Sequence, residues 1–415
     1  MKIAILSDLH IGIEAKSQDL CPIGLVKKCD KARFRVKSTN YIPEFIKFLK
    51  SNKISADYLL VPGDVTDAGH PVAVELASAV LEKVRLALGV NSAKMIFVPG
   101  NHDVDWGMQD KKDTTGIKWG LRYAAFQSSR YVFSAINKRG IGDLWDGGFY
   151  KVWDFPEMLV LGYNTSSTDR PDLEPHAGEI VEQHLKMIDE QLDRKAINND
   201  KLRVCLIHHH LKNYSWPTGT GQDFSAARGG NNMIAFLERY NFDLIVHGHR
   251  HYSFLDAKFG NIPILCAGSF SAQVSSVWEG AVLNQFHLID VSKNPSSGRA
   301  HGIIRSWSNT MTGWVESEEK NGSYTIGHER GFGLSLQDEE LAKKVWRKMR
   351  VCVKRNEDFW WRRNIVPSIP ELVYLIESTK DVITWCENNC IDARRWEVFP
   401  AKGDIVFMRK KGGRK

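Results

Sequence analysis

Residues 63–69 read Gly63-Asp64-Val65-Thr66-Asp67-Ala68-Gly69, and the fold is organised around this stretch. It follows the apolar run Tyr58–Val61, which predicts a short buried strand that ends at Pro62. A glycine then allows a sharp turn and places the Asp64 carboxylate at the carboxyl end of the strand. Open α/β sheets gather their ligands at this edge, so the sequence predicts a functional carboxylate at position 64.

Four further apolar runs end in the same way, each followed by aspartate, asparagine or histidine. These segments are Asp8-Leu9-His10, Gly100-Asn101-His102-Asp103, His208-His209-His210 and Gly248-His249-Arg250-His251. Carboxylate, imidazole and amide ligands suit a divalent ion such as Mn, Fe or Zn. The set contains no cysteine, which argues against a structural zinc site. It is also larger than one ion binds, so we predict two ions that share the Asp64 carboxylate.

The composition is that of an ordinary globular protein. The chain has 415 residues, of which 43% are hydrophobic and 25% are charged, enough for one large domain and a smaller one. No stretch approaches the ~18 apolar residues of a transmembrane helix. The first predicted strand begins at Lys2, which leaves no room for a cleavable signal peptide. Seven scattered cysteines fit a reducing compartment, so we expect a cytoplasmic protein without a membrane segment.

Periodic patterns predict an α/β core. Strands are predicted over residues 2–6, 58–61, 95–98, 149–153, 158–163, 202–207 and 243–246, with helices over 41–52, 71–88, 118–138, 178–195 and 232–240. Further strands are predicted over 252–258, 262–267, 285–291 and 302–307. Alternating strands and helices followed by a run of strands indicate two packed sheets with helices on them.

The C-terminal part differs from this core in its charge. From Gln337 to Lys415 it holds 18 Lys and Arg against 12 Asp and Glu, while the rest of the chain is nearly neutral. Helices are predicted over 336–361 and 370–388, and two short strands over 397–408. We therefore predict a core domain over residues 1–315 and a basic, tryptophan-containing accessory region over residues 316–415.

Basic and aromatic residues alternate in this accessory region, and two explanations stay open. The tryptophans at 346, 360 and 361 lie among Lys343, Lys344, Arg347, Lys348, Arg350, Lys354, Arg355, Arg362 and Arg363. Such a pattern can follow a phosphate backbone and stack on bases. It is equally typical of an amphipathic helix whose tryptophans pack on a core while its basic side chains are solvated.

Taken together, the strand-end motifs resemble those of the calcineurin-like metallophosphoesterase superfamily. Their order is Asp-x-His, Gly-Asp-x-x-Asp, Gly-Asn-His-Asp, His and Gly-His-x-His, over residues 8–251. The resemblance extends over about residues 1–315. It implies a four-layer α/β/β/α metallophosphoesterase sandwich, followed here by the C-terminal accessory region.

The resemblance also implies a ligand set for two metal ions. One ion would be held by Asp8, His10, Asp64 and His251. The other would be held by Asp64, Asn101, His208 and His249. His102 would be a catalytic histidine beside the scissile phosphate, held by Asp103, and Asp67 would support the loop around Asp64.

A phosphoesterase reaction follows from these implied roles. Two cations ~3.5–4 Å apart clamp phosphoryl oxygens and turn a bound water into a metal-bound hydroxide. His102 could give a proton or positive charge to the leaving oxygen. We expect a metal-dependent phosphodiesterase that acts on nucleotides or nucleic acid, with Mn²⁺ as the first choice and Fe, Zn or Ni as alternatives.

Several points stay open at this level. Strand phase favours His208 as the ligand, with His209 and His210 as alternatives. Arg250 could contact a substrate phosphate, face solvent or form a salt bridge. The basic loop over residues 11–40 and the basic C-terminal region favour a polyanionic or nucleotidic substrate. The alternatives are a phosphomonoesterase or nucleotidase of the same fold, or a non-catalytic interaction module. No partner protein is indicated.

Overall fold

A computed structural model of the chain describes most of its residues. The described residues are 1–13, 15–22, 40–106, 122–129, 133, 136, 140–145, 148–169, 176–193, 200–215, 225–258, 260–273, 282–293, 298–318, 324–401 and 404–410. Most of the predicted basic loop over 11–40 and much of the predicted helix over 118–138 therefore lie outside the described residues. Within the latter range the structure has a short helix, α3 (Ala124–Ser128).

The first sheet is built on three parallel strands from the N-terminal part of the chain. Its order is β13-β12-β11-β1-β2-β3, in which β1, β2 and β3 are parallel and β11 runs antiparallel to β1. The strands are β1 (Lys2–Ile5), β2 (Tyr58–Val61), β3 (Met95–Phe97), β11 (Gln285–Lys293), β12 (Ala300–Thr310) and β13 (Gly313–Glu316). All four side chains of β2 are buried, as the apolar run predicted.

The second sheet has the order β4-β5-β6-β7-β8-β10-β9. Strands β6, β7, β8 and β10 are parallel, and antiparallel strands close both edges. The strands are β4 (Ile141–Asp143), β5 (Tyr150–Asp154), β6 (Met158–Tyr163), β7 (Leu202–Leu206), β8 (Leu244–His247), β9 (Ser253–Asp256) and β10 (Ile264–Ala267). The parallel strands of each sheet thus have their carboxyl ends at one edge.

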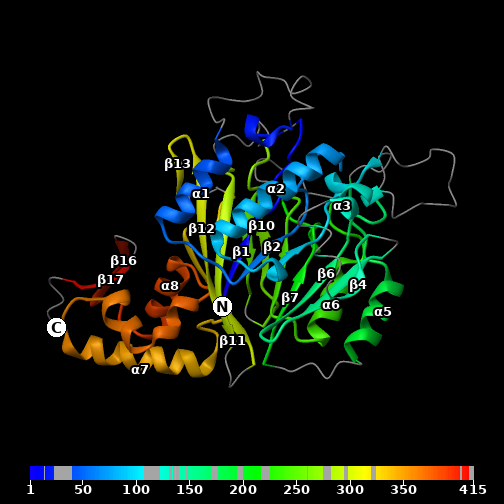
Figure 1. The fold of residues 1–415 in the computed structure, drawn as a ribbon. Coiled ribbons are helices and arrows are strands. Elements are labelled where there is room, and N and C mark those ends of the chain that lie inside the picture. Colours follow the sequence, from blue (N-terminus) through cyan, green and yellow to red (C-terminus); the bar gives the residue numbers. More distant parts are fainter. Residues whose placement is uncertain are drawn as a thin grey trace. The chain divides into compact units, whose positions relative to one another are not determined.

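Helices cover the two sheets and complete four layers. On the first sheet, α1 (Tyr41–Ser51) packs Phe45 against Phe286 of β11, with ring centroids 5.1 Å apart, and α1 contacts α2 (Pro71–Leu88). On the second, α5 (Glu182–Asp193) and α6 (Gly230–Arg239) bury Ile188 and Phe236 in one hydrophobic cluster with the strands. Figure 1 shows the two pairs of helices on separate parts of the core. The predicted α/β/β/α architecture is confirmed.

Local sequence signals explain where these helices begin and end. Helix α2 begins at Pro71, which suits a first turn, and ends before Gly89, which adopts the left-handed φ of 73° that favours glycine. The two long helices predicted in the C-terminal part are shorter than expected. Helix α7 (Glu339–Arg355) stops because Asn356 takes a left-handed φ of 62°. Helix α8 (Thr379–Asn389) starts only at the Ser378 cap, after a short 3₁₀ turn at Pro370–Tyr374.

The chain divides into two compact units. The first comprises Met1–Asp256, Ile262–Ala300 and Ile304–Glu329, and the second comprises Ala257–Asn261, His301–Ile303 and Arg330–Lys415. The second unit holds α7, α8 and a sheet of order β15-β17-β16. Its strands are β15 (Phe359–Trp360), β16 (Trp396–Ala401) and β17 (Asp404–Arg409), and β14 (Glu329–Phe332) lies at its start. The predicted domain boundary at residue 315 falls within β13, and the division into 1–315 and 316–415 stays a prediction.

Two further expectations concern membrane segments and cysteines. Within the described ranges, no helix is long and apolar enough to cross a membrane. Cys205, Cys266, Cys352, Cys386 and Cys390 are free. Cys21 is disulfide-bonded, which departs from the expectation of reduced cysteines throughout.

Candidate metal centre

The predicted ligand residues follow the carboxyl ends of parallel strands from both sheets. Asp8 and His10 follow β1, Asp64 follows β2, Asn101 follows β3, His208 follows β7, and His249 and His251 follow β8. They come together because β1, β2 and β3 end at the same edge, as do β7 and β8. The strand-end pattern in the sequence therefore corresponds to one site in space.

The backbone of this site is unusual. Eight described residues other than glycine have a positive φ, and five of them are predicted ligands. They are Asp8 (52°), His10 (47°), Asp64 (50°), His249 (71°) and His251 (56°). Non-glycine residues enter this region only where the surroundings hold them there, and such strain gathers at functional sites. The fold thus holds these five side chains in fixed directions.

A first group of donor atoms consists of Asp8, His10, Asp64 and His251, whose ligand atoms all lie within 4.8 Å of one another. The Nε2 of His10 lies 3.6 Å from Asp64 Oδ2 and 3.0 Å from the Nε2 of His251. The Nε2 of His251 lies 3.5 Å from Asp8 Oδ1. This is the set that the resemblance assigned to one metal.

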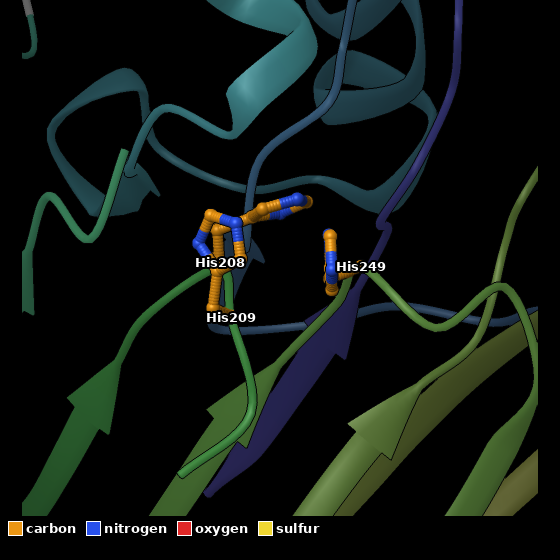
Figure 2. A group of neighbouring side chains, drawn as sticks. All are labelled: His208, His209 and His249. Carbon is orange, nitrogen blue, oxygen red and sulfur yellow. The ribbon is translucent and has the colours of Figure 1, made fainter. Parts of the chain in front are cut away.

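A second group lies around His208 and His249 (Figure 2). The Nε2 of His208 lies 3.1 Å from Asp64 Oδ2 and 3.1 Å from Asn101 Oδ1. The Nδ1 of His249 also lies 3.1 Å from Asn101 Oδ1. Asp64 Oδ2 therefore faces both groups, as a bridging carboxylate must.

The second group also includes His209, which the sequence left as an alternative ligand. Its Nδ1 lies 2.7 Å from Thr165 Oγ1, and its Nε2 lies 3.1 Å from the carbonyl oxygen of His176. Both nitrogens thus have other partners. In His208, by contrast, Nδ1 donates to the carbonyl of Pro62 at 2.7 Å, so Nε2 is the ring nitrogen that faces Asp64 and Asn101. The geometry favours His208 over His209, and His210 lies buried beside His247.

The Asp103 carboxylate contacts groups other than the His102 ring. Its carboxylate accepts hydrogen bonds from the Thr66 amide (3.0 Å), the Thr66 hydroxyl (3.0 Å) and the Gly100 amide (2.9 Å). The Nδ1 of His102 instead lies 3.0 Å from the carbonyl oxygen of Asp67. Asp103 is held by the donors of its own loops, so it clamps the loops after β2 and β3 rather than holding His102.

Other residues near the site were missed or misjudged in the sequence. Asp67 Oδ1 lies 3.4 Å from His10 Nδ1, so this residue also orients a ligand. Ser225 Oγ lies 3.0 Å from His249 Nε2, and no sequence signal marks this serine. Arg250 does not face solvent: it is buried against the rings of Tyr214 and Tyr252.

The charges of the site are strongly coupled. Burial raises the pKa of Asp8, whereas His208 and His102 outweigh burial at Asp64 and hold its pKa well below its usual range. Burial lowers the pKa of His10, but Asp67 and the other carboxylates reverse this and raise it to about 9. The carboxylates likewise overcome burial at His208 and raise its pKa to about 9. The buried carboxylates thus favour the protonated, positively charged forms of His10 and His208.

This donor set fits divalent cations. Buried carboxylates that attract positive charge lie beside imidazole nitrogens that can bind a metal once deprotonated, and no thiol is among the donors of the two groups. Burial and neighbouring histidines hold the pKa of His249 and His251 well below their usual range, so both are neutral imidazoles able to bind metal. Two donor groups joined by Asp64 match two ions.

Comparison with known proteins gives one family. The family model of calcineurin-like phosphoesterases matches residues 1–253. No curated protein matches the chain.

The solved structures that match this chain have low sequence identity and low TM-scores. A dimetal phosphatase from Danio rerio is 11% identical with a TM-score of 0.44, over 74% of this chain and 95% of that one. Vacuolar Protein Sorting 29 from Cryptosporidium parvum is 12% identical with a TM-score of 0.33, over 76% and 94%. GAP50 of Plasmodium is 12% identical with a TM-score of 0.37, over 77% and 88%.

Proposed function

Because the chain belongs to the family of calcineurin-like phosphoesterases, whose members use a dinuclear metal centre, we propose that it is a two-metal phosphodiesterase. Its substrates in this proposal are the phosphodiesters of nucleotides or nucleic acid. The observation that carries the proposal is the position of Asp64 Oδ2, which lies 3.6 Å from His10 Nε2 and 3.1 Å from His208 Nε2. A single carboxylate oxygen between two groups of nitrogen donors supports a centre for two ions.

In this proposal, two groups of residues would hold the ions. Asp8, His10, Asp64 and His251 would hold one ion, and Asp64, Asn101, His208 and His249 would hold the other. Bound Mn²⁺, or alternatively Fe, Zn or Ni, would neutralise phosphoryl oxygens and lower the pKa of a water. Asp67 would orient His10 through its Nδ1, and Ser225 would orient His249 through its Nε2.

His102 would act on the leaving group. Its amide donates to Asp64 Oδ1 at 2.8 Å, which fixes the residue beside the shared carboxylate. Its Nδ1 donates to the Asp67 carbonyl, so the mobile proton belongs to Nε2. Burial lowers the pKa of His102, which makes its protonated form a stronger acid than a free histidine. That form is suited to protonate a departing alkoxide oxygen.

The substrate class rests on charge. The second unit carries a surplus of Lys and Arg, and polyanionic substrates are attracted to such a surface. A phosphodiesterase that acts on nucleotidic substrates would use the metal centre for hydrolysis and the surplus of Lys and Arg for substrate binding. A phosphomonoesterase would give these basic residues no role.

A substrate panel tests the proposal. The purified chain should be stripped of metal, reloaded with Mn²⁺, and given a phosphodiester, the matching phosphomonoester, and single- and double-stranded DNA and RNA. We expect diesters to be hydrolysed with higher kcat/KM than monoesters, and Asp64→Asn and His102→Ala to abolish most of the activity. A preference for monoesters would establish the alternative phosphatase. Activity that persists in both variants would refute the two-metal mechanism.

A further inference from the structure

The outward face of α7 is strongly basic. The helix buries Leu341, Val345, Met349 and Cys352 in the core of this unit. At 3.6 residues per turn, the opposite side presents Lys343, Arg347, Arg350 and Lys354, with Trp346 beside them. All five side chains are exposed. We call these five residues the α7 basic face.

Most of the positive charge on this face is not neutralised. Lys343 pairs with Glu339 at 2.6 Å and with Glu340 at 3.5 Å. In the part of the chain that the structure describes, no carboxylate forms an ion pair with Arg347, Arg350 or Lys354. Among the described residues these three cations therefore have no carboxylate partner, and like charges so close together repel one another.

The needs of the helix itself explain only part of this pattern. Glu339 and Glu340 in the first turn and Lys354 and Arg355 in the last turn complement the helix dipole. Arg347 and Arg350 lie in the middle of the helix, where the dipole gives no such advantage. The helix dipole therefore does not account for these two charges.

The exposed tryptophan supplies the second observation. Trp361 is buried in the core of the unit, as the packing explanation predicted, but Trp346 is 39% exposed. The guanidinium carbon of Arg350 lies 4.6 Å from the centre of the Trp346 ring. An aromatic ring held beside an arginine at the surface can stack with a planar base, while the arginine contacts the phosphate next to it.

We propose that the α7 basic face binds single-stranded nucleic acid. This inference rests on the proposed function for its choice of substrate class. It adds which surface of the protein would hold the strand. A membrane surface fits less well, because the apolar stripe of α7 is already buried and cannot insert into lipid. An acidic peptide would use the cations but has no need of the Trp346 ring.

Binding should be measured apart from hydrolysis. The full chain is titrated, in EDTA to prevent cleavage, into a labelled single-stranded DNA or RNA oligonucleotide of mixed sequence, at several salt concentrations. We expect binding that weakens with salt. Arg347→Ala and Arg350→Ala should each lower the log–log salt slope by about 0.7, which corresponds to one lost phosphate contact on a single strand. Trp346→Ala should weaken binding about 5- to 100-fold, and Trp346→Phe should retain most of it.

A control variant tests whether binding depends on the α7 basic face or only on the total positive charge of the unit. Arg394→Ala removes an exposed cation of the same unit that pairs with Asp392 at 3.1 Å, and it should leave binding unchanged. A loss with Arg394→Ala equal to that of Arg350→Ala, no effect of Trp346→Ala, or tighter binding to anionic vesicles or polyglutamate would overturn the proposal. Oligonucleotide binding without hydrolysis by the Mn²⁺-loaded protein would refute the proposed reaction and leave this inference standing.

Discussion

Asp64 Oδ2 and His208 Nε2 lie 3.1 Å apart, although Asp64 follows a strand of the first sheet and His208 a strand of the second. Both side chains are almost fully buried. The Nδ1 of His208 also donates to the Pro62 carbonyl at 2.7 Å, so the histidine is anchored to the loop that carries Asp64. The contact joins the ends of the two sheets, and the geometry of the site therefore depends on how the sheets pack.

Replacing the shared carboxylate should weaken the binding of both ions. We expect Asp64→Asn to lower the metal content from two ions per chain to one or fewer. Activity should fall at least about 100-fold, since even residues that only orient a ligand reduce it 10- to 100-fold. Metal analysis of dialysed protein and kcat/KM on a phosphodiester measure both effects.

The matched control is Glu44→Gln, the same acid-to-amide change at an exposed position of α1. It should keep two ions and full activity. Retention of two ions in Asp64→Asn would show that each ion has a complete ligand set without the shared carboxylate.

Metal binding should become tighter as pH rises. The pKa of His10 and of His208 is raised to about 9, so at neutral pH both are protonated when no metal is bound. A cation must displace these protons, and each proton released makes the affinity up to about tenfold stronger per pH unit. We expect the Mn²⁺ affinity to rise between pH 6.5 and 9 and to level off above. Calorimetry in buffers of different ionisation enthalpy measures affinity and proton release.

The metal-free protein should show the opposite trend in stability. A histidine whose folded pKa exceeds its unfolded value near 6.5 stabilises the fold below that value, and the effect is lost as pH rises through about 9. The Tm in EDTA should therefore fall from pH 6.5 to 9. His328→Asn, outside the site, should leave this slope unchanged. A Tm in EDTA that stays level over this range would contradict the assignment.

The sequence indicated which residues gather at the strand ends, but not the hydrogen bonds that hold their loops in place. Ligand types at strand ends can be recognised because parallel strands bring their carboxyl ends to one edge. Strand β2 and helix α2 were predicted to the residue, since their apolar period is closed by Pro62 and Gly89. The clamp formed by Asp103 could not be predicted, because its partners at Thr66 and Gly100 depend on tertiary packing.

The same limit applies to the C-terminal unit. Its basic and aromatic pattern predicted an amphipathic helix, which α7 is, but the pattern does not distinguish a packed tryptophan from an exposed one. Trp361 is buried because it faces the core of the unit. Trp346 is exposed because it lies on the side of α7 that points away from this core. To distinguish them, one must know which side of the helix faces the core and where the helix begins and ends. The sequence predicted a helix over 336–361, which is several residues too long at each end.

Asp103→Asn tests whether this residue clamps loops or orients His102. The amide keeps one oxygen, so its NH2 group would face either the Gly100 amide or the Thr66 amide and hydroxyl, and such a buried mismatch of donors costs about 1–3 kcal/mol. We expect a lower Tm and weaker Mn²⁺ binding, with the pH profile of kcat unchanged in the metal-saturated enzyme. A shifted pH profile at normal Tm would instead restore the predicted role of Asp103 as the partner of His102.

Substrates with different leaving groups test whether His102 is a proton donor. If its Nε2 protonates the leaving oxygen, His102→Ala should lower kcat about 10²- to 10⁴-fold for a diester that releases an alkoxide such as a ribose oxygen. The loss should be much smaller for a nitrophenyl diester, because a nitrophenolate departs without a proton. An equal loss on both substrates would mean that His102 stabilises charge on the phosphoryl group instead. His328→Ala controls for the loss of an imidazole elsewhere and should leave both rates unchanged, and metal analysis should find two ions in each variant.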